Sequence, residues 1–431
     1  MSGMDIPLPE FEPRLQRRYQ QLVNEHLHTS ERQASGARAL PSVNEAFAST
    51  QAAWRYYANP AVTLPGLAAP LQAQARRDLP KVCRHYGLIL HDWSDLLYGS
   101  HTSKRDRKQI GKDEGYELAT ALLINDQTGA PLVPVSLGLW ANDGWHTTHQ
   151  VQPRRDLSPL GLTSELMDVL REQSWVLPLV HIIDREGDSV FHYRQWQANG
   201  HLFLVRANDG QRVVWNGHTQ LLREVTRELE LCGSQAVEIS ANLIGQLLVG
   251  QTQIVIDRPA FPRARDGKRR WIQGQPIELR LILCQVRLPD ETLFAEWYLL
   301  SNVGPQVTAE QLAEWYYWRW RIESYFKLLK SHGFQIEQWK QTTAEAIAKR
   351  LLVAAMACVV VWHLQRATEP ETVALRDLLI RLSGRQVRRG QATAPALLAG
   401  LWTFLAAIEL LDHYDLADLK RMARLAVPGY S

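Results

Sequence analysis

The sequence lacks the features that mark secreted, zinc-stabilised or membrane-spanning chains. Its four cysteines are widely separated and form no CxxC pair, which excludes a zinc module of closely spaced cysteines and predicts a reducing compartment. The first residues contain no apolar run of the kind that a secretory signal needs. The main apolar runs, 351–362 and 394–408, are too short to cross a bilayer and predict buried helices. We therefore expect a soluble, cytoplasmic protein.

An excess of charge of one sign is also missing. The chain has 48 Lys and Arg against 45 Asp and Glu, so its net charge of +3 indicates no partner. Its 431 residues, 45% hydrophobic and 22% charged, suit a globular protein of two to four domains. The basic residues are clustered, however, within 76–77, 104–112, 263–270 and 385–389. These clusters predict either local phosphate-binding grooves or loops kept soluble by charge.

The order of the apolar runs predicts the fold. Residues 1–80 contain helical patterns, chiefly 14–26 and 42–57, that are broken by Pro, and they indicate a small helical domain. The following runs predict three antiparallel strands and then helix, strand, helix and strand, at 86–91, 116–125, 132–139, 163–174, 177–183, 188–198 and 201–207. This is the order of a ribonuclease H-like catalytic core, a mixed α/β sheet.

Three further segments complete the expected organisation. Residues 208–300 predict a β-rich insertion, with strands expected at 211–215, 228–231, 236–240, 253–257, 277–286 and 296–301. Residues 301–345 return to the core, and 346–431 predict a helical C-terminal region that could dimerise. The expected division of the chain is therefore 1–80, 81–207, 208–300, 301–345 and 346–431.

The stretch 316–330 is the most informative. It contains no Pro or Gly and predicts one continuous helix. At about 100° per residue, a face of about 80° carries a phenol, a guanidinium, a carboxylate and two ammonium groups, from Tyr316, Arg319, Glu323, Lys327 and Lys330. Taken alone, such a face is more often a solvated stripe, here with a Glu323–Lys327 pair worth about 0.3 kcal/mol.

The spacing of these residues adds a resemblance. Tyr-x2-Arg-x3-Glu-x6-Lys resembles the Tyr-Arg-Glu-Lys signature of the insertion-sequence-four family of bacterial DDE transposases. The β-rich insertion is similar to that of the transposon-five type in this family, and residues 51–60 resemble a segment of its N-terminal DNA-binding domain. The resemblance covers about residues 45–345. It implies a cut-and-paste transposase that binds terminal inverted repeats, pairs two ends as a homodimer, cuts double-stranded DNA through a hairpin and joins the 3′ ends to target DNA.

The acidic residues that such chemistry needs can be sought independently. Phosphoryl transfer on DNA is served by two divalent cations, which require a few convergent carboxylates. Asp184 follows the apolar run 177–183, where a strand would fix the direction of a carboxylate, although a helix N-cap is an equal reading of the residues. Asp92 follows the run 87–91 in the same way, with Asp95 as the competing first acid.

The resemblance assigns roles to these residues. It makes Asp92, Asp184 and Glu323 the catalytic acids and the ligands of two Mg²⁺ ions, for which Mn²⁺ could substitute. It places Tyr316, Arg319 and Lys330 on the 5′ phosphate, Lys327 on the DNA backbone, and Trp297, or less favourably Trp320, on a flipped base. Arg206 is a further phosphate candidate or an ordinary surface residue. Two rivals remain: a metal-dependent nuclease with the same core, and a transposase-derived DNA-binding protein that no longer cuts.

Overall fold

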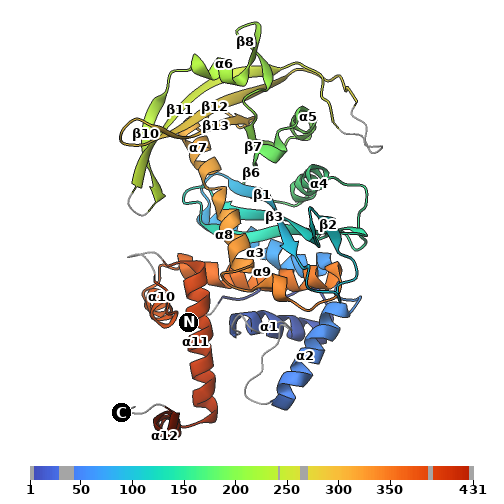
Figure 1. Cartoon of the computed structure of the whole chain (residues 1–431), viewed down its shortest axis with the longest axis vertical. Helices are drawn as coiled ribbons and strands as arrows, with labels where there is room; N and C mark the ends of the chain where they lie inside the picture. Colours follow the sequence, from blue (N-terminus) through green and yellow to red (C-terminus); the bar gives the residue numbers. More distant parts are fainter. Residues whose placement is uncertain (1–3, 29–42, 241–242, 263–269, 387–391, 427–431) are drawn as a thin grey trace.

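The structure is a computed structural model of the chain, and it describes residues 4–28, 43–240, 243–262, 270–386 and 392–426. Parts of two predicted basic clusters, 263–269 and 387–389, lie outside these residues. Figure 1 shows a large sheet with helices on both faces and a helical C-terminal part below it. The expectation of a mixed α/β sheet flanked by helical regions is confirmed.

The centre of the sheet has the predicted strand order. It consists of strands arranged as β4-β3-β1-β6-β7, with bounds β1 (Gly87–Leu97), β3 (Asp113–Asn125), β4 (Pro131–Ala141), β6 (Leu179–Ile183) and β7 (Leu202–Ala207). Strand β3 is antiparallel to both of its neighbours, β4 and β1, whereas β6 is parallel to β1 and β7 is parallel to β6. The crossover helices are α4 (Pro159–Glu172) and α5 (Val190–Ala198). This arrangement is the ribonuclease H-like core.

Strand β1 differs from the prediction in its length. The run 86–91 was expected to end before Asp92, but β1 continues to Leu97, so Asp92 lies in the middle of a strand. Residues 87–91 are buried because β3 and β6 flank them on both sides. Beyond that point β6 has ended and only β3 remains as a partner, which explains why polar residues are accommodated in the second half.

The β-rich segment continues the same sheet beyond β7 (Figure 1). The order continues β7-β13-β12-β11-β8-β9, and β10 pairs with β11. The strand predicted at 228–231 is not formed. These residues are an irregular connection that follows helix α6 (Leu222–Arg227). The strands of this part are β8 (Arg212–Trp215), β9 (His218–Leu221), β10 (Cys232–Ser240), β11 (Leu243–Ile256), β12 (Ile277–Arg287) and β13 (Leu293–Ser301); two short strands, β2 (Lys108–Ile110) and β5 (Gly144–Thr147), lie at the other side of the sheet.

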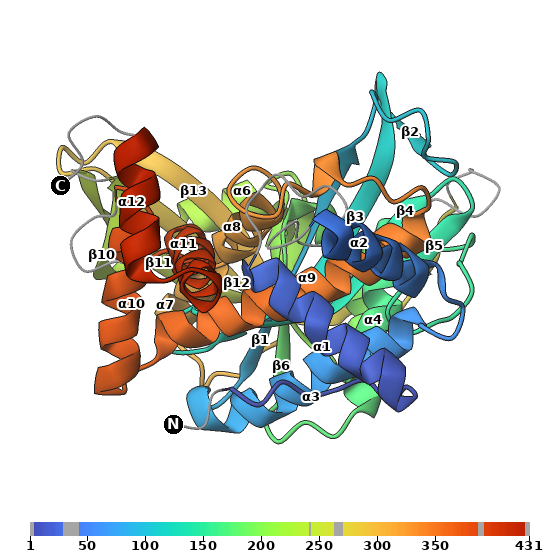
Figure 2. The same cartoon turned by 90° about the horizontal axis from the view of Figure 1, so that it is seen from below.

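The N-terminal helices pack on a helix from the far end of the chain. The two expected helices are present as α1 (Pro13–His28) and α2 (Val43–Ala58), and a third, α3 (Leu64–Val82), begins at a Thr63 cap with Pro in its first turn. Helices α1 and α3 lie against the buried helix α9 (Ala344–Arg366), as Figure 2 shows. One hydrophobic core therefore joins both ends of the chain to the sheet.

The C-terminal region is helical, as predicted, but one expectation about it is wrong. It consists of α10 (Pro370–Leu382), α11 (Ala394–His413) and α12 (Leu416–Ala426). The run 394–408 was expected to be too short for a membrane span, yet α11 has 20 residues and, by length and composition, could cross one. Only 28% of the most apolar 18-residue stretch of α11 is buried, because the second half of the helix extends away from the body of the protein (Figure 1).

Candidate active site

The signature segment forms two helices rather than one. Helix α7 (Ala309–Tyr317) ends before Trp318, and α8 (Trp320–Leu329) starts after Arg319. At the junction, the Arg319 N–H donates to the Tyr316 carbonyl at 3.0 Å and the Arg321 N–H donates to the Trp318 carbonyl at 2.9 Å, which is the tighter i→i+3 pattern. Trp318 packs on Gly129, where a Cβ atom would lie 2.5 Å from the indole ring. The predicted single helix is thus wrong, and the tight turn lies beside a buried tryptophan.

The pairing of β1 with β6 brings two of the predicted acids together. The parallel register pairs His91 with Ile183, so the next residues, Asp92 and Asp184, lie on adjacent strands at the carboxyl end of β6. Strand alternation turns both side chains to the same face of the sheet. The Asp184 Oδ1 atom also accepts the Glu186 N–H at 2.9 Å and caps the short 3₁₀ turn Arg185–Gly187. Asp184 therefore both follows the end of a strand and caps the next turn, so the two alternatives from the sequence hold together.

Arg319 links the third acid to the first. Its Nη1 donates to Asp92 Oδ2 at 2.9 Å and its Nη2 donates to Glu323 Oε1 at 2.8 Å. Burial opposes the Arg319 charge, but the facing oxygens of Asp92, Tyr316, Glu323 and Asp184 outweigh burial and raise its pKa. Arg319 is only 9% exposed, so the guanidinium that holds Asp92 and Glu323 belongs to a buried residue.

The three carboxylates place negative charge in a restricted space. Burial raises the pKa of Asp92 to about 6, the Arg319 charge opposes this rise, and the nearby Asp184 and Glu323 add to it. Asp95 has the opposite parity along β1, so its exposed side chain leaves the sheet on the other face. The site is therefore built from Asp92, and it draws cations because its carboxylates repel one another.

Donor groups adjoin the acids. The pKa of Tyr316 is raised, chiefly by burial. The charges of Arg319 and Arg206 and a hydrogen bond with the Arg206 side chain only partly offset this rise. Arg206 lies at the end of β7, opposite Leu299 of β13, and is half-buried. The Trp297 ring centroid lies 6.3 Å from that of Tyr316. The structure thus brings Tyr316, Arg319, Arg206 and Trp297 to one side of the carboxylates.

The two lysines of the signature are placed differently. Lys330, at the end of α8, donates to the Asp95 carbonyl, and its Nζ lies 3.8 Å from Glu337 Oε1. Lys327 is exposed and lines a separate cavity between α8 and the C-terminal helices. Among the described residues, neither lysine forms a hydrogen bond or ion pair with Asp92, Asp184 or Glu323.

An aromatic cavity lies next to the site. It has a volume of about 550 Å³, and its ring-bearing residues are Phe294, Trp297, Tyr317, Trp318 and Trp320. Phe294 is 54% and Trp320 is 55% exposed, a large exposure for such side chains. The sequence predicted a base-stacking role for Trp297 and Trp320 but not for Phe294, Tyr317 or Trp318. These rings come together only in the folded chain.

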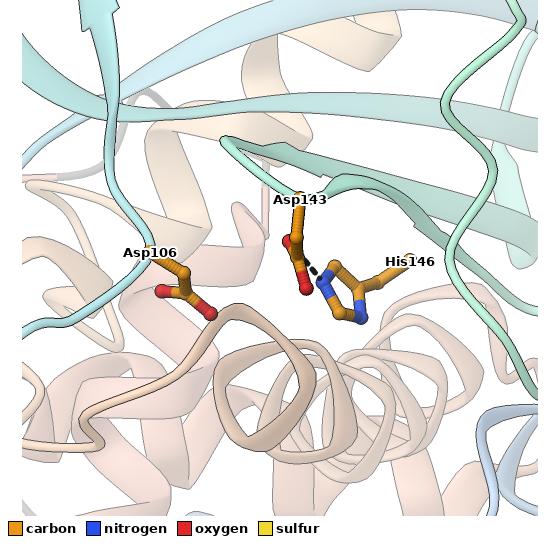
Figure 3. Close-up of side chains that lie close together, drawn as sticks. All are labelled: Asp106, Asp143 and His146. Carbon is orange, nitrogen blue, oxygen red and sulfur yellow. Dashed lines mark hydrogen bonds and ion pairs between the residues drawn. The ribbon is translucent and has the colours of Figure 1, made fainter.

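A different group of possible metal ligands was not predicted. Asp106, Asp143 and His146 have ligand atoms within 4.8 Å of one another (Figure 3). These groups already have partners: Asp106 accepts the Tyr116 hydroxyl at 2.6 Å and the Ala344 N–H at 2.8 Å, and His146 Nε2 lies 3.0 Å from Asp143 Oδ1. The group ties the β4–β5 turn to the start of α9. We assign it a structural role.

The fold and the site together define a ribonuclease H-like protein with an acidic centre. Residues 180–360 match the family model described as "Transposase DDE domain". Asp184 and Glu323 lie within the match, and Asp92 precedes it.

No curated protein sequence matches the chain significantly. A solved structure described as the piggyBac transposase synaptic complex with hairpin DNA is similar at 10% identity and a TM-score of 0.36, over 96% of this chain and 76% of that one.

Proposed function

We propose that this chain is a cut-and-paste DNA transposase with Asp92, Asp184 and Glu323 as its catalytic acids. One observation carries the proposal: three carboxylates from distant parts of the sequence converge on Arg319, and two of them lie within the segment that matches the DDE transposase family model. The more specific assignment to the insertion-sequence-four family rests on the Tyr316, Arg319, Glu323 and Lys330 spacing.

The donor set fits divalent cations. Carboxylate oxygens are the ligands that Mg²⁺ and Mn²⁺ prefer, and the mutual repulsion that acts on Asp92 would be relieved by a bound cation. Asp92, Asp184 and Glu323 would hold two Mg²⁺ ions, with Mn²⁺ as a substitute. Such ions would lower the pKa of an attacking water or 3′ hydroxyl and neutralise the charge that develops at the phosphorus.

The residues beside the acids would position the DNA end. Arg319 can present its planar guanidinium to two phosphate oxygens, and the Tyr316 hydroxyl and Arg206 add donors next to it. In each step, an oxygen of water or of a 3′ hydroxyl forms a bond to phosphorus while the opposite phosphorus–oxygen bond breaks. Lys327 and Lys330 would contact the backbone further along, because they lie away from the acids on the same helix.

A hairpin intermediate is supported by the aromatic cavity. Making a hairpin at a DNA end requires a sharply bent strand, and extruding a base relieves that bend. Trp297 and Trp320 line a cavity of about 550 Å³ next to the acids and could stack on such a base. We propose Trp297 as the main stacking residue because its ring also neighbours Tyr316.

The remaining parts of the chain would bind and pair the two inverted repeats. A cleft of about 410 Å³ between α1 and α2 contains Arg14, Arg17, Arg18 and Arg55, and could hold DNA phosphates as part of an N-terminal end-binding domain. The free half of α11 exposes Ile408, Leu410 and Leu411, an apolar face suited to a second copy of the chain. We therefore propose a homodimer that pairs two ends in the bacterial cytoplasm and joins them to target DNA.

The test uses DNA from either side of the gene as substrate. Duplex containing the proposed end, labelled at its 5′ terminus, would be incubated with Mg²⁺ and resolved on a denaturing gel. Wild type should give a nick and then a hairpin-sized product, and Glu323→Gln should give neither. Glu371→Gln, a matched change at an exposed position of α10, should behave as wild type. Binding without cleavage by wild type would indicate the cleavage-inactive rival, and scattered cuts would indicate the nuclease.

A further inference from the structure

A second cavity, which we call the basic groove, lies along α8 beside the aromatic cavity. It has a volume of about 770 Å³ and runs between α8, the end of α9, α10 and the start of α11. None of the described residues that line it is acidic, whereas five carry basic groups: Arg321, Lys327, His332, Arg376 and Arg385. Such one-sided charge in a concave surface attracts a polyanion.

Two of these arginines are held in place by backbone carbonyls. Arg376 Nη1 donates to the carbonyls of Gln365 and Ala367 at 3.0 Å and 3.1 Å, at the carboxyl end of α9. Arg385 Nη2 donates to the His332 carbonyl at 3.3 Å. A guanidinium has five N–H donors, so Arg376 keeps donors that can face the groove. These contacts fix the cations before any ligand arrives, which lowers the entropic cost of binding.

The start of α11 adds to the positive potential. This 20-residue helix begins at the groove, where Thr393 caps it by accepting the Ala396 N–H. The first turn of a helix carries a partial positive charge that favours anions. The basic groove thus combines fixed guanidinium groups with a helix N-terminus.

Two cations on α8 are available to a ligand. Arg321 and Lys327 are exposed, and within the described part of the chain their side chains have no hydrogen bond or ion pair. They lie on the helix that also carries Glu323, so they are close in sequence to the proposed catalytic centre.

The basic groove and the aromatic cavity are adjacent. Arg321 and Ser324 line both, one from each of two successive turns of α8. A strand that places a base among the rings can therefore continue with its phosphates past these two residues.

We propose that the basic groove binds the phosphodiester backbone of the DNA strand whose base enters the aromatic cavity. The proposal rests on the proposed function, and it adds a second DNA contact surface made by the C-terminal helices. Phosphates match the groove because the groove offers planar guanidinium donors and no carboxylate. An acidic protein segment is the alternative occupant, and the test below separates the two.

The first experiment measures how DNA binding depends on salt. The double variant Arg321→Gln, Lys327→Gln would be compared with wild type on end-containing duplex between 50 mM and 300 mM KCl, roughly the range in which phosphate contacts dominate. Loss of two phosphate contacts should reduce the slope of log K against log salt by about 1.8 and weaken binding roughly tenfold. The matched control Lys420→Gln, Arg421→Gln removes the same charge from α12 and should keep the wild-type slope. A wild-type slope in the groove variant would overturn the proposal.

The second experiment locates the DNA. Ser324→Cys, in a chain whose exposed Cys232 is replaced by Ser, would be reacted with duplexes that carry a bromoacetyl group on a single phosphorothioate. Cross-linking restricted to the phosphates nearest the cleaved end supports the proposal, and cross-linking spread over all positions overturns it.

Two further outcomes keep this proposal distinct from the proposed function. If a ten-residue polyglutamate binds wild type but not the groove variant, while the groove variant keeps the wild-type affinity and salt slope for DNA, the groove takes an acidic segment and the DNA assignment falls. If wild type binds no end-containing duplex at all, the proposed function fails together with the groove. If wild type binds and cuts the ends while the groove variant keeps the wild-type slope and affinity, only the groove assignment is wrong.

Discussion

Arg319 is hydrogen-bonded to Asp92 through Nη1 at 2.9 Å while its other terminal nitrogen holds Glu323. One guanidinium therefore occupies the space between two of the three proposed metal ligands. A phosphate at the DNA end would draw this guanidinium away, since phosphate offers it the same bidentate geometry. The pair thus couples the binding of DNA to the exposure of the carboxylates to cations.

Replacing Arg319 should separate these two roles. In Arg319→Gln, Mn²⁺ measured by electron paramagnetic resonance in the absence of DNA should bind at least about tenfold more tightly, because a competing charge is removed. Cleavage of the end should nevertheless fall more than about a hundredfold, because the phosphate loses its partner. Arg227→Gln on α6 should change neither quantity. Weaker Mn²⁺ binding in Arg319→Gln would show that the guanidinium organises the carboxylates rather than competing for them.

The two candidates for the first acid can be distinguished directly. Asp92→Asn should reduce cleavage by roughly a thousandfold or more and leave end binding within about twofold, because one ligand of the proposed ions is lost. Asp95→Asn removes the same charge from the opposite face of β1 and should cleave within about threefold of wild type. Cleavage would be followed on the labelled end duplex and binding by gel shift. The reverse pattern would make Asp95 the first acid.

Trp297 should matter for one step more than for others. Trp297→Ala should slow hairpin formation more than about tenfold and leave the first nick nearly unchanged, since stacking on a flipped base is needed only when the strand bends. Time courses on denaturing gels separate the two products. Trp271→Ala removes an exposed indole that is stacked on Phe261 and should affect neither step. Equal slowing of both steps by Trp297→Ala would indicate a folding defect.

The stability of the fold should fall in mild acid because of buried histidines. Burial, followed by the Arg350 charge, lowers the pKa of His26 from 6.5 to about 3. Its Nδ1 is 2.8 Å from the Leu22 carbonyl and must carry the proton, and its buried Nε2 has no hydrogen-bond partner among the described residues. Below pH 6.5, His26 binds a proton in the unfolded chain but not in the folded chain. The free energy of unfolding therefore decreases as the pH falls toward 3.

The effect can be isolated with one variant and one control. Each such histidine should lower the free energy of unfolding by about 2 kcal/mol between pH 7 and pH 5. Urea titrations should show that His26→Phe loses about 2 kcal/mol less than wild type over this range. His218→Phe, at an exposed position of β9, should lose as much as wild type. An unchanged pH dependence in His26→Phe would mean that His26 is protonated in the folded chain.

The local pattern of the sequence was sufficient for most of the core. The apolar run 177–183 corresponds to β6, and the runs 116–125 and 132–139 correspond to β3 and β4, because continuous apolar runs depend on neighbours in the chain. The length of β1 could not be predicted in this way. Its second half is a strand because β3 pairs with it as far as Leu97 and Gly115, which lie 18 positions apart along the chain.

The break in the signature helix shows the same limit more clearly. Residues 316–330 contain nothing that disfavours a helix, yet the chain turns at Trp318 and Arg319 where the indole rests on Gly129. The break separates Tyr316 on α7 from Glu323 and Lys327 on α8. Arg319 at the turn still holds Glu323, and Lys327 lines the basic groove. The sequence located these residues but not the two surfaces to which they belong.

The sequence by itself determined most secondary elements of the core, the strand-end position of Asp184 and the spacing of the signature residues, because these depend on local periodicity and on residue type. The tertiary structure decided which carboxylates meet, since only the β1–β6 register sets Asp92 beside Asp184 and only the folded α8 presents Glu323 to the same guanidinium. It also decided the two cavities beside α8: the aromatic cavity joins residues as far apart as Val237 and Ser324, and the basic groove joins residues as far apart as Pro131 and Pro395. Convergence of this kind arises from packing between distant segments, and local patterns in one sequence do not predict such packing.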